Sequence, residues 1–380
     1  MKHYFPFFAL AAASFTMSSC AESNAGTQSQ QDQSATVYMT EEITPQSLVK
    51  IFEALGVDVP ENARVAIKIS TGESSRTNYL RPDFIAPLQA ATGGRLVECN
   101  TAYGGSRSTT ADHRKAIEER GYADVDIMDE EGTLHLPVVD TTWIKYDIVG
   151  SHLQNYDFFI NLAHFKGHQM GGFGGVLKNQ SIGVASSTGK AYIHSAGVTD
   201  DVVETWSHTG NQDGFLESMA AAAQAVHNYF KQDGKNIVYI NVMNNMSIDC
   251  DCNAHPAIPQ LKDMGILAST DPVALDKACL DLVFGHQSTA GDNADPLIRR
   301  IEQMHGTHTV EYAEHLGLGT QSYRLVNIDG NTTGVDNAAA NAERYNVFTV
   351  DGKKVLTNAT SLESLAPGMY IINGQKKTVQ

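Results

Sequence analysis

Basic side chains precede a glycine-rich segment between positions 164 and 178. His164, Lys166 and His168 are followed by glycines at 171, 172, 174 and 175 and then by Lys178. Lysines can bind a carboxylate or phosphate, glycines let the backbone approach an anion, and imidazole transfers protons near neutral pH. The segment lacks the ending of a Walker A loop and is not a dinucleotide-binding fingerprint. Taken alone, it is better explained as a flexible turn with surface lysines, because glycine-rich loops are common.

A second cluster lies in the stretch IDCDCNAHP, where Cys250, Cys252 and His255 fall within six residues. Thiolate and imidazole suit zinc or iron, but three ligands leave a position that another residue such as Cys99 would have to fill. The alternatives are a Cys250–Cys252 disulfide or two free structural thiols. His164 and His168 are also spaced as metal ligands on a helix, but Gly167 makes a helix there a poor prediction.

Strand-like and helix-like stretches alternate along most of the chain. Apolar runs at 63–70, 94–100, 156–164 and 235–244 predict buried strands. Helical spacing predicts helices between them, the first with Thr44 as N-cap, Pro45 at its first turn and Gly56 after its end. This alternation predicts an α/β fold: a mostly parallel sheet with helices on both faces.

The loops that follow these strands carry most of the polar candidates. Ligands bind beyond the carboxyl ends of parallel strands, so we expect these loops to form one crevice. The candidates are Lys68 after the first strand, Asn100 and Arg107 after the second, His164, Lys166, His168 and the glycines Gly172, Gly174 and Gly175 after the third, and the Cys250/Cys252 loop after the fourth. Further on, Asp271 is predicted to cap a helix, with Cys279 in its core face and Asp276 solvated.

The composition limits the partners. The formal net charge is −16, which argues against nucleic acid because such binding needs a basic surface. Basic residues converging on one crevice in an acidic chain point instead to an anionic small molecule.

The N-terminus has the character of an export signal. Lys2 precedes an apolar stretch and small residues, so we expect residues 1–19 to be a signal peptide. Met17 to Cys20 resembles a bacterial lipobox, in which Cys20 would be lipidated and would anchor the chain to a membrane; cleavage after Ala25 is the competing interpretation. Residues 20–36 are polar and predict a flexible tether. The protein is then exported, to the periplasm or the outer-membrane surface.

The C-terminus changes character after a small-polar linker at 331–343. Residues 344–380 contain only strand and turn signals, including the pairs Asp351-Gly352 and Asn373-Gly374. This module resembles the type IX secretion sorting tails of Bacteroidota.

We expect residues 37–330 to form one α/β domain. From about Val65 to Leu325 it resembles the family called domain of unknown function 362, through HFKGHQMGGFGGVLKNQSIG (164–183), GKAYIH (189–194), CDC (250–252), DMGILASTDPVALDKACLDLV (263–283) and GLGTQSYRL (317–325). Many relatives look like iron–sulfur proteins, but this chain lacks their inserted ferredoxin module and any C-x2-C-x2-C run, so such a cluster is not expected. The resemblance implies an α/β fold and a site, and leaves the reaction open. The positions that carry over are His164, Lys166, His168, Lys178, Asn179, Lys190, His194, Cys250 and Cys252.

Three functions remain open at this point. The first is a redox or metal-dependent enzyme that uses Cys250 and Cys252, with the metal cofactor, if any, unidentified. The second is a non-redox acid/base enzyme in which His164 or His168 is the base and Lys166 or Lys178 stabilises the anion. The third is a surface protein that only binds its ligand.

Overall fold

The computed structural model describes residues 34–74 and 78–330 and, further on, residues 345–349, 353–359, 362, 365–372 and 375–379. The predicted signal peptide, Cys20 and the linker at 331–343 lie outside the described residues. Ala35 and Thr36, which we expected in the tether, belong to the first strand of the sheet.

An eight-stranded sheet forms the centre of the fold, in the order β12-β1-β11-β10-β7-β2-β3-β4. Only β11 runs antiparallel to its neighbours, so the predicted mostly parallel sheet is confirmed. The strands are β1 (Ala35–Thr40), β2 (Val65–Lys68), β3 (Arg95–Glu98), β4 (Asp126–Ile127), β7 (Phe158–His164), β10 (Asn236–Met243), β11 (Gly265–Ser269) and β12 (Tyr323–Asn327).

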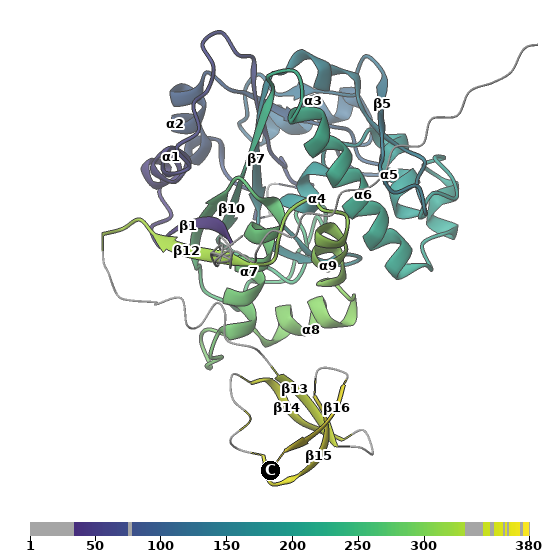
Figure 1. Cartoon of the computed structure of the whole chain (residues 1–380). Coiled ribbons are helices and arrows are strands. Elements are labelled where there is room, and N and C mark those ends of the chain that lie inside the picture. The colour runs from purple at the N-terminus through teal and green to yellow at the C-terminus, as the bar shows by residue number, and fades with distance from the viewer. Residues whose placement is uncertain are drawn as a thin grey trace, which may run out of the picture. The chain divides into compact units, whose positions relative to one another are not determined.

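Helices cover both faces of this sheet (Figure 1). Side chains of β7 alternate between two apolar cores: Phe158 and Ile160 pack on one face, and Phe159 and Ala163 on the other. Such two-sided burial explains why the strand reads as a continuous hydrophobic run. The first face is covered by α1 (Pro45–Ala54), α2 (Pro82–Thr92) and α3 (Thr110–Glu119), the second by α4 (Val176–Gln180), α6 (Gln212–Phe230) and α7 (Pro272–Gly285).

Capping residues set the helix boundaries as predicted. The Thr44 side chain accepts a hydrogen bond from the Ser47 amide at the start of α1, and Gly56 has a positive φ of 61° just beyond its end. Asp271 caps α7 by accepting from the amides of Val273 and Ala274. No helix among the described residues is long and apolar enough to cross a membrane.

Smaller elements complete the described chain. They comprise the hairpins β5 (Thr133–Pro137) with β6 (Tyr146–Gly150) and β8 (Lys166–His168) with β9 (Gly172–Gly174), the helices α5 (Ser187–His194), α8 (Asp295–Gln303) and α9 (His308–His315), and the 3-10 turns Ser151–Asn155 and Glu204–Ser207. A separate antiparallel sheet has the order β14-β13-β15-β16 and consists of β13 (Tyr345–Thr349), β14 (Lys354–Ala359), β15 (Gly368–Ile372) and β16 (Gln375–Val379).

Candidate functional site

A cavity of about 360 Å³ opens at the carboxyl ends of β2, β3 and β7. The chain passes from β2 to β3 and β4 on one side, then returns to place β7 on the other side of β2. A sheet whose strand order reverses in this way leaves a crevice between the diverging connections, which is where α/β proteins bind ligands. Lys68 ends β2 and His164 ends β7, so the predicted position of the site is the position of the cavity.

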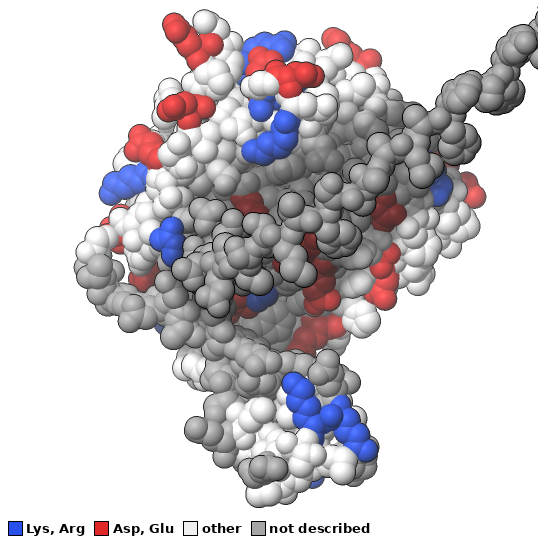
Figure 2. Space-filling model, viewed as in Figure 1, with Lys and Arg blue, Asp and Glu red and all other residues white. Residues whose placement is uncertain are grey.

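Five cationic side chains line this cavity, against two carboxylates, Glu98 and Asp251. The five are Lys68, Arg107, Lys166, Lys178 and Lys190. The cavity therefore has an excess of positive side chains, although the net charge of the chain is negative. On the face drawn in Figure 2, by contrast, acidic and basic side chains of the α/β domain are interspersed.

Two of the cations are neutralised within the protein. The Lys166 Nζ lies 3.0 Å from the Asp251 Oδ2, and the Arg107 Nη1 lies 2.5 Å from the Glu98 Oε1. Among the described residues, Lys68, Lys178 and Lys190 have no carboxylate oxygen within 4.0 Å. The cavity therefore holds three ammonium groups that a bound anion could pair with.

Burial lowers the pKa of two of these three lysines. Desolvation, opposed by the charge of Glu98, lowers the pKa of Lys68 to about 8. Desolvation together with the neighbouring charges of Lys166 and Lys68 lowers the pKa of Lys178 to about 7. The Lys68 Nζ still donates to the Ile69 carbonyl and to Asn179, whereas the Lys178 Nζ has no hydrogen-bond partner among the described residues.

A buried polar network fixes α4 and with it Lys178. The Asn161 side chain on β7 donates to the Val176 carbonyl at 2.9 Å, and the Asn179 amide donates to the Asn161 Oδ1 at 2.8 Å. Asp276 accepts from the amides of Val176 and Leu177 at 2.9 and 3.0 Å. The expectation that Asp276 is solvated is wrong: its carboxylate is fully buried because it caps the first turn of α4.

The glycines make room for side chains of the protein itself. A Cβ on Gly175 would lie 2.2 Å from Asp276, and a Cβ on Gly174 would touch the stems of Lys178 and Lys166 at 3.4 and 3.8 Å. Gly172 packs against Gly306 and is outside the cavity lining. Since Asp276 already accepts from the first amides of α4, the glycine run positions the lysines and does not offer those amides to an anion.

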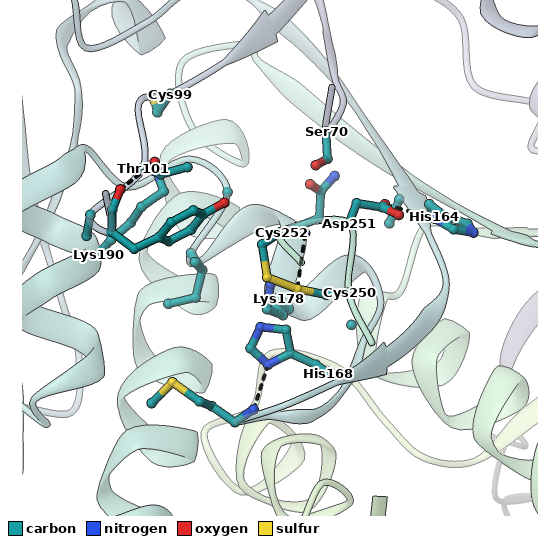
Figure 3. A pocket seen from close by; sticks show the side chains of 18 of the residues that line it. Ser70, Cys99, Thr101, His164, His168, Lys178, Lys190, Cys250, Asp251 and Cys252 are labelled. Atoms are coloured by element: carbon teal, nitrogen blue, oxygen red, sulfur yellow. Dashed lines mark hydrogen bonds and ion pairs between the residues drawn. A yellow bond between two sulfur atoms is a disulfide. The ribbon is translucent and has the colours of Figure 1, made fainter. Parts of the chain in front are cut away.

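Cys250 and Cys252 form a disulfide in the wall of the cavity, with their Cα atoms 5.2 Å apart. His168 is directed at this disulfide (Figure 3), and one of its ring nitrogens lies within 4.8 Å of both sulfurs. His168 Nδ1 accepts from the amides of Met170 and Gly171 at 3.2 and 2.8 Å. The neutral ring therefore carries its proton on Nε2. Burial, reinforced by Lys178, holds the pKa of His168 well below its ordinary value, so the ring is a neutral N–H donor at physiological pH.

This donor geometry bears on metal binding. Two groups among the described residues could hold a metal ion: Asp126, Glu130 and His152, which are outside the cavity lining, and His168, Cys250 and Cys252 once the disulfide is reduced. A metal would need the lone pair of the nitrogen that carries the proton here, since Nδ1 is occupied by two amides. The arrangement suits hydrogen bonding to sulfur better than ligation of a metal.

Asp251, between the two cysteines, was not among the predicted site residues. Its Oδ2 lies 2.9 Å from His164 Nδ1 and 3.0 Å from Lys166 Nζ. Burial disfavours its charged form, but Lys166 and His164 outweigh that and hold the pKa of Asp251 below its usual range. The only sequence signal for Asp251 was its position between two candidate cysteines.

A model of the family described as "Domain of unknown function (DUF362)" matches residues 65–281. The chain belongs to this family. Among solved structures, the lactate racemase apoprotein from Thermoanaerobacterium thermosaccharolyticum is 14% identical, with a TM-score of 0.31, over 56% of this chain and 51% of that one. A protein from Thermotoga maritima is 13% identical, with a TM-score of 0.36, over 73% of this chain and 59% of that one. The chain thus spans little more than half of the length of those two proteins. A comparison with curated proteins found no match.

Most of the residues singled out in this DUF362 chain line one cavity. The structure brings together Lys68, Arg107, His164, Lys166, His168, Gly174, Gly175, Lys178, Asn179, Lys190, His194, Cys250 and Cys252. Three predicted residues are outside the cavity lining: Gly172, Asn100 and His255. His255 is exposed, and the Asn100 side chain forms hydrogen bonds with Thr110 and His113. Glu98, which holds Arg107 and His113, was missed; its position at the end of β3 was the available signal.

Proposed function

We propose that this DUF362 protein binds a small organic anion in the cavity and that Cys250 and Cys252 act there as a dithiol–disulfide couple. The observation that carries the proposal is that three lysines without carboxylate partners and a disulfide share one cavity. Its volume suits a ligand of a few to about a dozen heavy atoms, near the lower end of small-molecule sites.

Anion binding can be tested through proton uptake. At pH 7.5 Lys178 is partly deprotonated, and a bound anion favours its charged form. We expect calorimetry with malonate or inorganic phosphate, in two buffers of different ionisation enthalpy, to show protons taken up on binding. Lys178→Met should lose most of this uptake, whereas the exposed Lys262→Met should not. Binding without uptake, or equal uptake in both variants, would contradict the role of Lys178.

The redox role needs a separate experiment on the full chain. Purification without oxygen, followed by metal analysis and thiol titration, should give two reactive thiols that return reversibly to a disulfide. Stoichiometric metal that is lost in Cys250→Ser/Cys252→Ser would favour a metal centre with His168 instead. Two inert thiols would reject both versions and leave either acid/base catalysis or a surface protein that only binds its ligand.

A second candidate function is acid/base catalysis without redox chemistry, and the geometry shifts its residues. His164 and Lys166 are both tied to Asp251, and His168 Nδ1 is occupied by amides. Lys178 is free of such partners and has a pKa of about 7, which suits a general base. Under this function, turnover would rise with pH through about 7 and would survive Cys250→Ser/Cys252→Ser.

Export and anchoring belong to the same proposal. We infer from the first twenty residues that the chain is exported and lipidated on Cys20. We infer from the strand and turn signals of residues 344–380 that these residues form a sorting module. Mass spectrometry of the mature protein from its native host should find a lipidated N-terminus at Cys20. An unmodified N-terminus after Ala25 would support the competing cleavage.

A further inference from the structure

The two sulfurs of the disulfide are not equivalent. Cys250 is 2% exposed, whereas Cys252 is partly exposed at the cavity. The backbone amide of Cys252 donates a hydrogen bond to the Cys250 Sγ at 3.3 Å, drawn as a dashed line in Figure 3. The pair therefore consists of a partly exposed cysteine and a buried one whose sulfur already accepts an N–H group.

This asymmetry suggests a direction for thiol–disulfide exchange. The incoming thiolate attacks one sulfur and the other leaves as a thiolate, so the reaction is favoured when the leaving sulfur is stabilised. The amide of Cys252 supplies such stabilisation to Cys250, and His168 directs a neutral ring at the pair. Cys250 is accordingly suited to leave and Cys252 to be attacked.

The charges of the cavity indicate what kind of thiol would enter. The ammonium groups of Lys68, Lys178 and Lys190 line the same cavity as the disulfide and lack carboxylate partners among the described residues. A thiol bearing a carboxylate or phosphate would pair with them, whereas a cationic thiol would be repelled.

We propose that the co-reactant of this site is a small anionic thiol, which forms its mixed disulfide with Cys252 and displaces Cys250. In the first step the thiolate sulfur bonds to the Cys252 sulfur, the Cys250–Cys252 bond breaks and Cys250 carries the electron pair as a thiolate. In the second step another thiolate attacks the sulfur of the bound thiol, releasing its symmetrical disulfide and leaving Cys252 as a thiolate. Two thiols are oxidised to one disulfide and the cysteine pair is reduced. This assignment rests on the redox function proposed above.

The position of the mixed disulfide is the first test. The oxidised full-length protein is mixed with 3-mercaptopropionate, quenched in acid after short times and mapped by mass spectrometry. We expect the adduct on Cys252. Cys250→Ser should accumulate the Cys252 adduct when treated with the oxidised probe, while Cys252→Ser should react at least about tenfold more slowly because its thiol is buried. An adduct mainly on Cys250 would overturn the assignment even if the pair cycles reversibly.

Charge selectivity is the second test. Reduction rates with 3-mercaptopropionate, 2-mercaptoethanol and cysteamine are each divided by the rate for an oxidised peptide of residues 248–256, which corrects for the intrinsic reactivity of each thiol. We expect a preference of roughly tenfold for the anionic over the neutral thiol at low salt, reduced in 0.5 M salt and in Lys178→Met. A ratio equal to that of the peptide would reject the anionic class. Failure of every thiol to reduce the folded protein would instead reject the redox function itself.

Discussion

Asp251 Oδ2 lies 3.0 Å from the Lys166 Nζ, and the aspartate is held in place by the disulfide-bonded cysteines on either side of it. The same oxygen lies 2.9 Å from His164 Nδ1 at the end of β7. One carboxylate thus ties the cysteine loop both to the sheet and to the glycine-rich hairpin. The candidate redox pair and the basic segment form one unit through this contact.

Asp251→Asn should destabilise the protein by about 3 kcal/mol, because removing one partner of a buried ion pair leaves the other charge uncompensated. The exposed Asp233→Asn is the matched control, since asparagine tolerates its positive φ of 56° as well as aspartate does. Urea unfolding at pH 7 measures both. Equal stability of the two variants would show that the Asp251 contacts with Lys166 and His164 contribute nothing net.

Much of the site's location followed from the sequence, because the carboxyl ends of parallel strands share one edge. Lys68 and His164 end two different strands and Cys250 lies in the loop after a third, and this rule placed them together. The rule does not say which way a loop side chain points. Asn100 therefore failed as a cavity residue: it turns to Thr110 and His113.

Other features required tertiary information. A short apolar run such as GILAS (265–269) predicts a buried strand but not its direction, so the antiparallel orientation of β11 between β1 and β10 could not be inferred. Asp276 and Val176 are 100 residues apart, and only the docking of α7 against α4 buries that carboxylate. Similarly, Asp251 and His164 are 87 positions apart in the sequence, and hydrophobic periodicity does not predict that their side chains pair.

Reduction of Cys250–Cys252 should leave the protein folded. The cysteines are two positions apart, and closing so short a loop restricts the unfolded chain by only about 1.5 kcal/mol. We expect urea unfolding with and without a dithiol reductant to differ by no more than about 2 kcal/mol. Cys99 and Cys279, which are buried, should stay unreactive toward a thiol reagent in the reduced native protein and serve as internal controls. A larger loss of stability would indicate a structural disulfide.

His168→Phe should raise the pKa of the reactive thiol of the reduced protein. His168 presents an N–H group toward the sulfurs, and a hydrogen bond to a thiolate favours the charged form, so its loss should shift the thiol by about one pKa unit. The pH dependence of alkylation by iodoacetamide measures the shift, with circular dichroism to verify folding. His255→Phe, on the same loop as the cysteines but exposed, is the control. The prediction fails if both variants titrate like the unmodified protein.

Acid should weaken the fold through its buried histidines. Burial lowers the pKa of His194 to about 4, although its bond to the Lys190 carbonyl opposes the shift, and burial likewise lowers the pKa of His227 to about 4. The unfolded chain protonates these rings near pH 6.5, so it binds more protons than the folded chain between pH 6.5 and 4. The free energy of unfolding therefore decreases as the pH is lowered through that window. The variant His194→Phe tests this.

His194→Phe preserves the stacking against Phe215 and removes one titrating group. The free energy of unfolding of this variant should therefore change less between pH 7 and 5.5 than that of the unmodified protein, by on the order of 1 kcal/mol. Urea titrations at these two pH values provide the measurement. A pH dependence unchanged from that of the unmodified protein would mean that His194 takes up protons equally in the folded and unfolded states, and would contradict the lowered pKa.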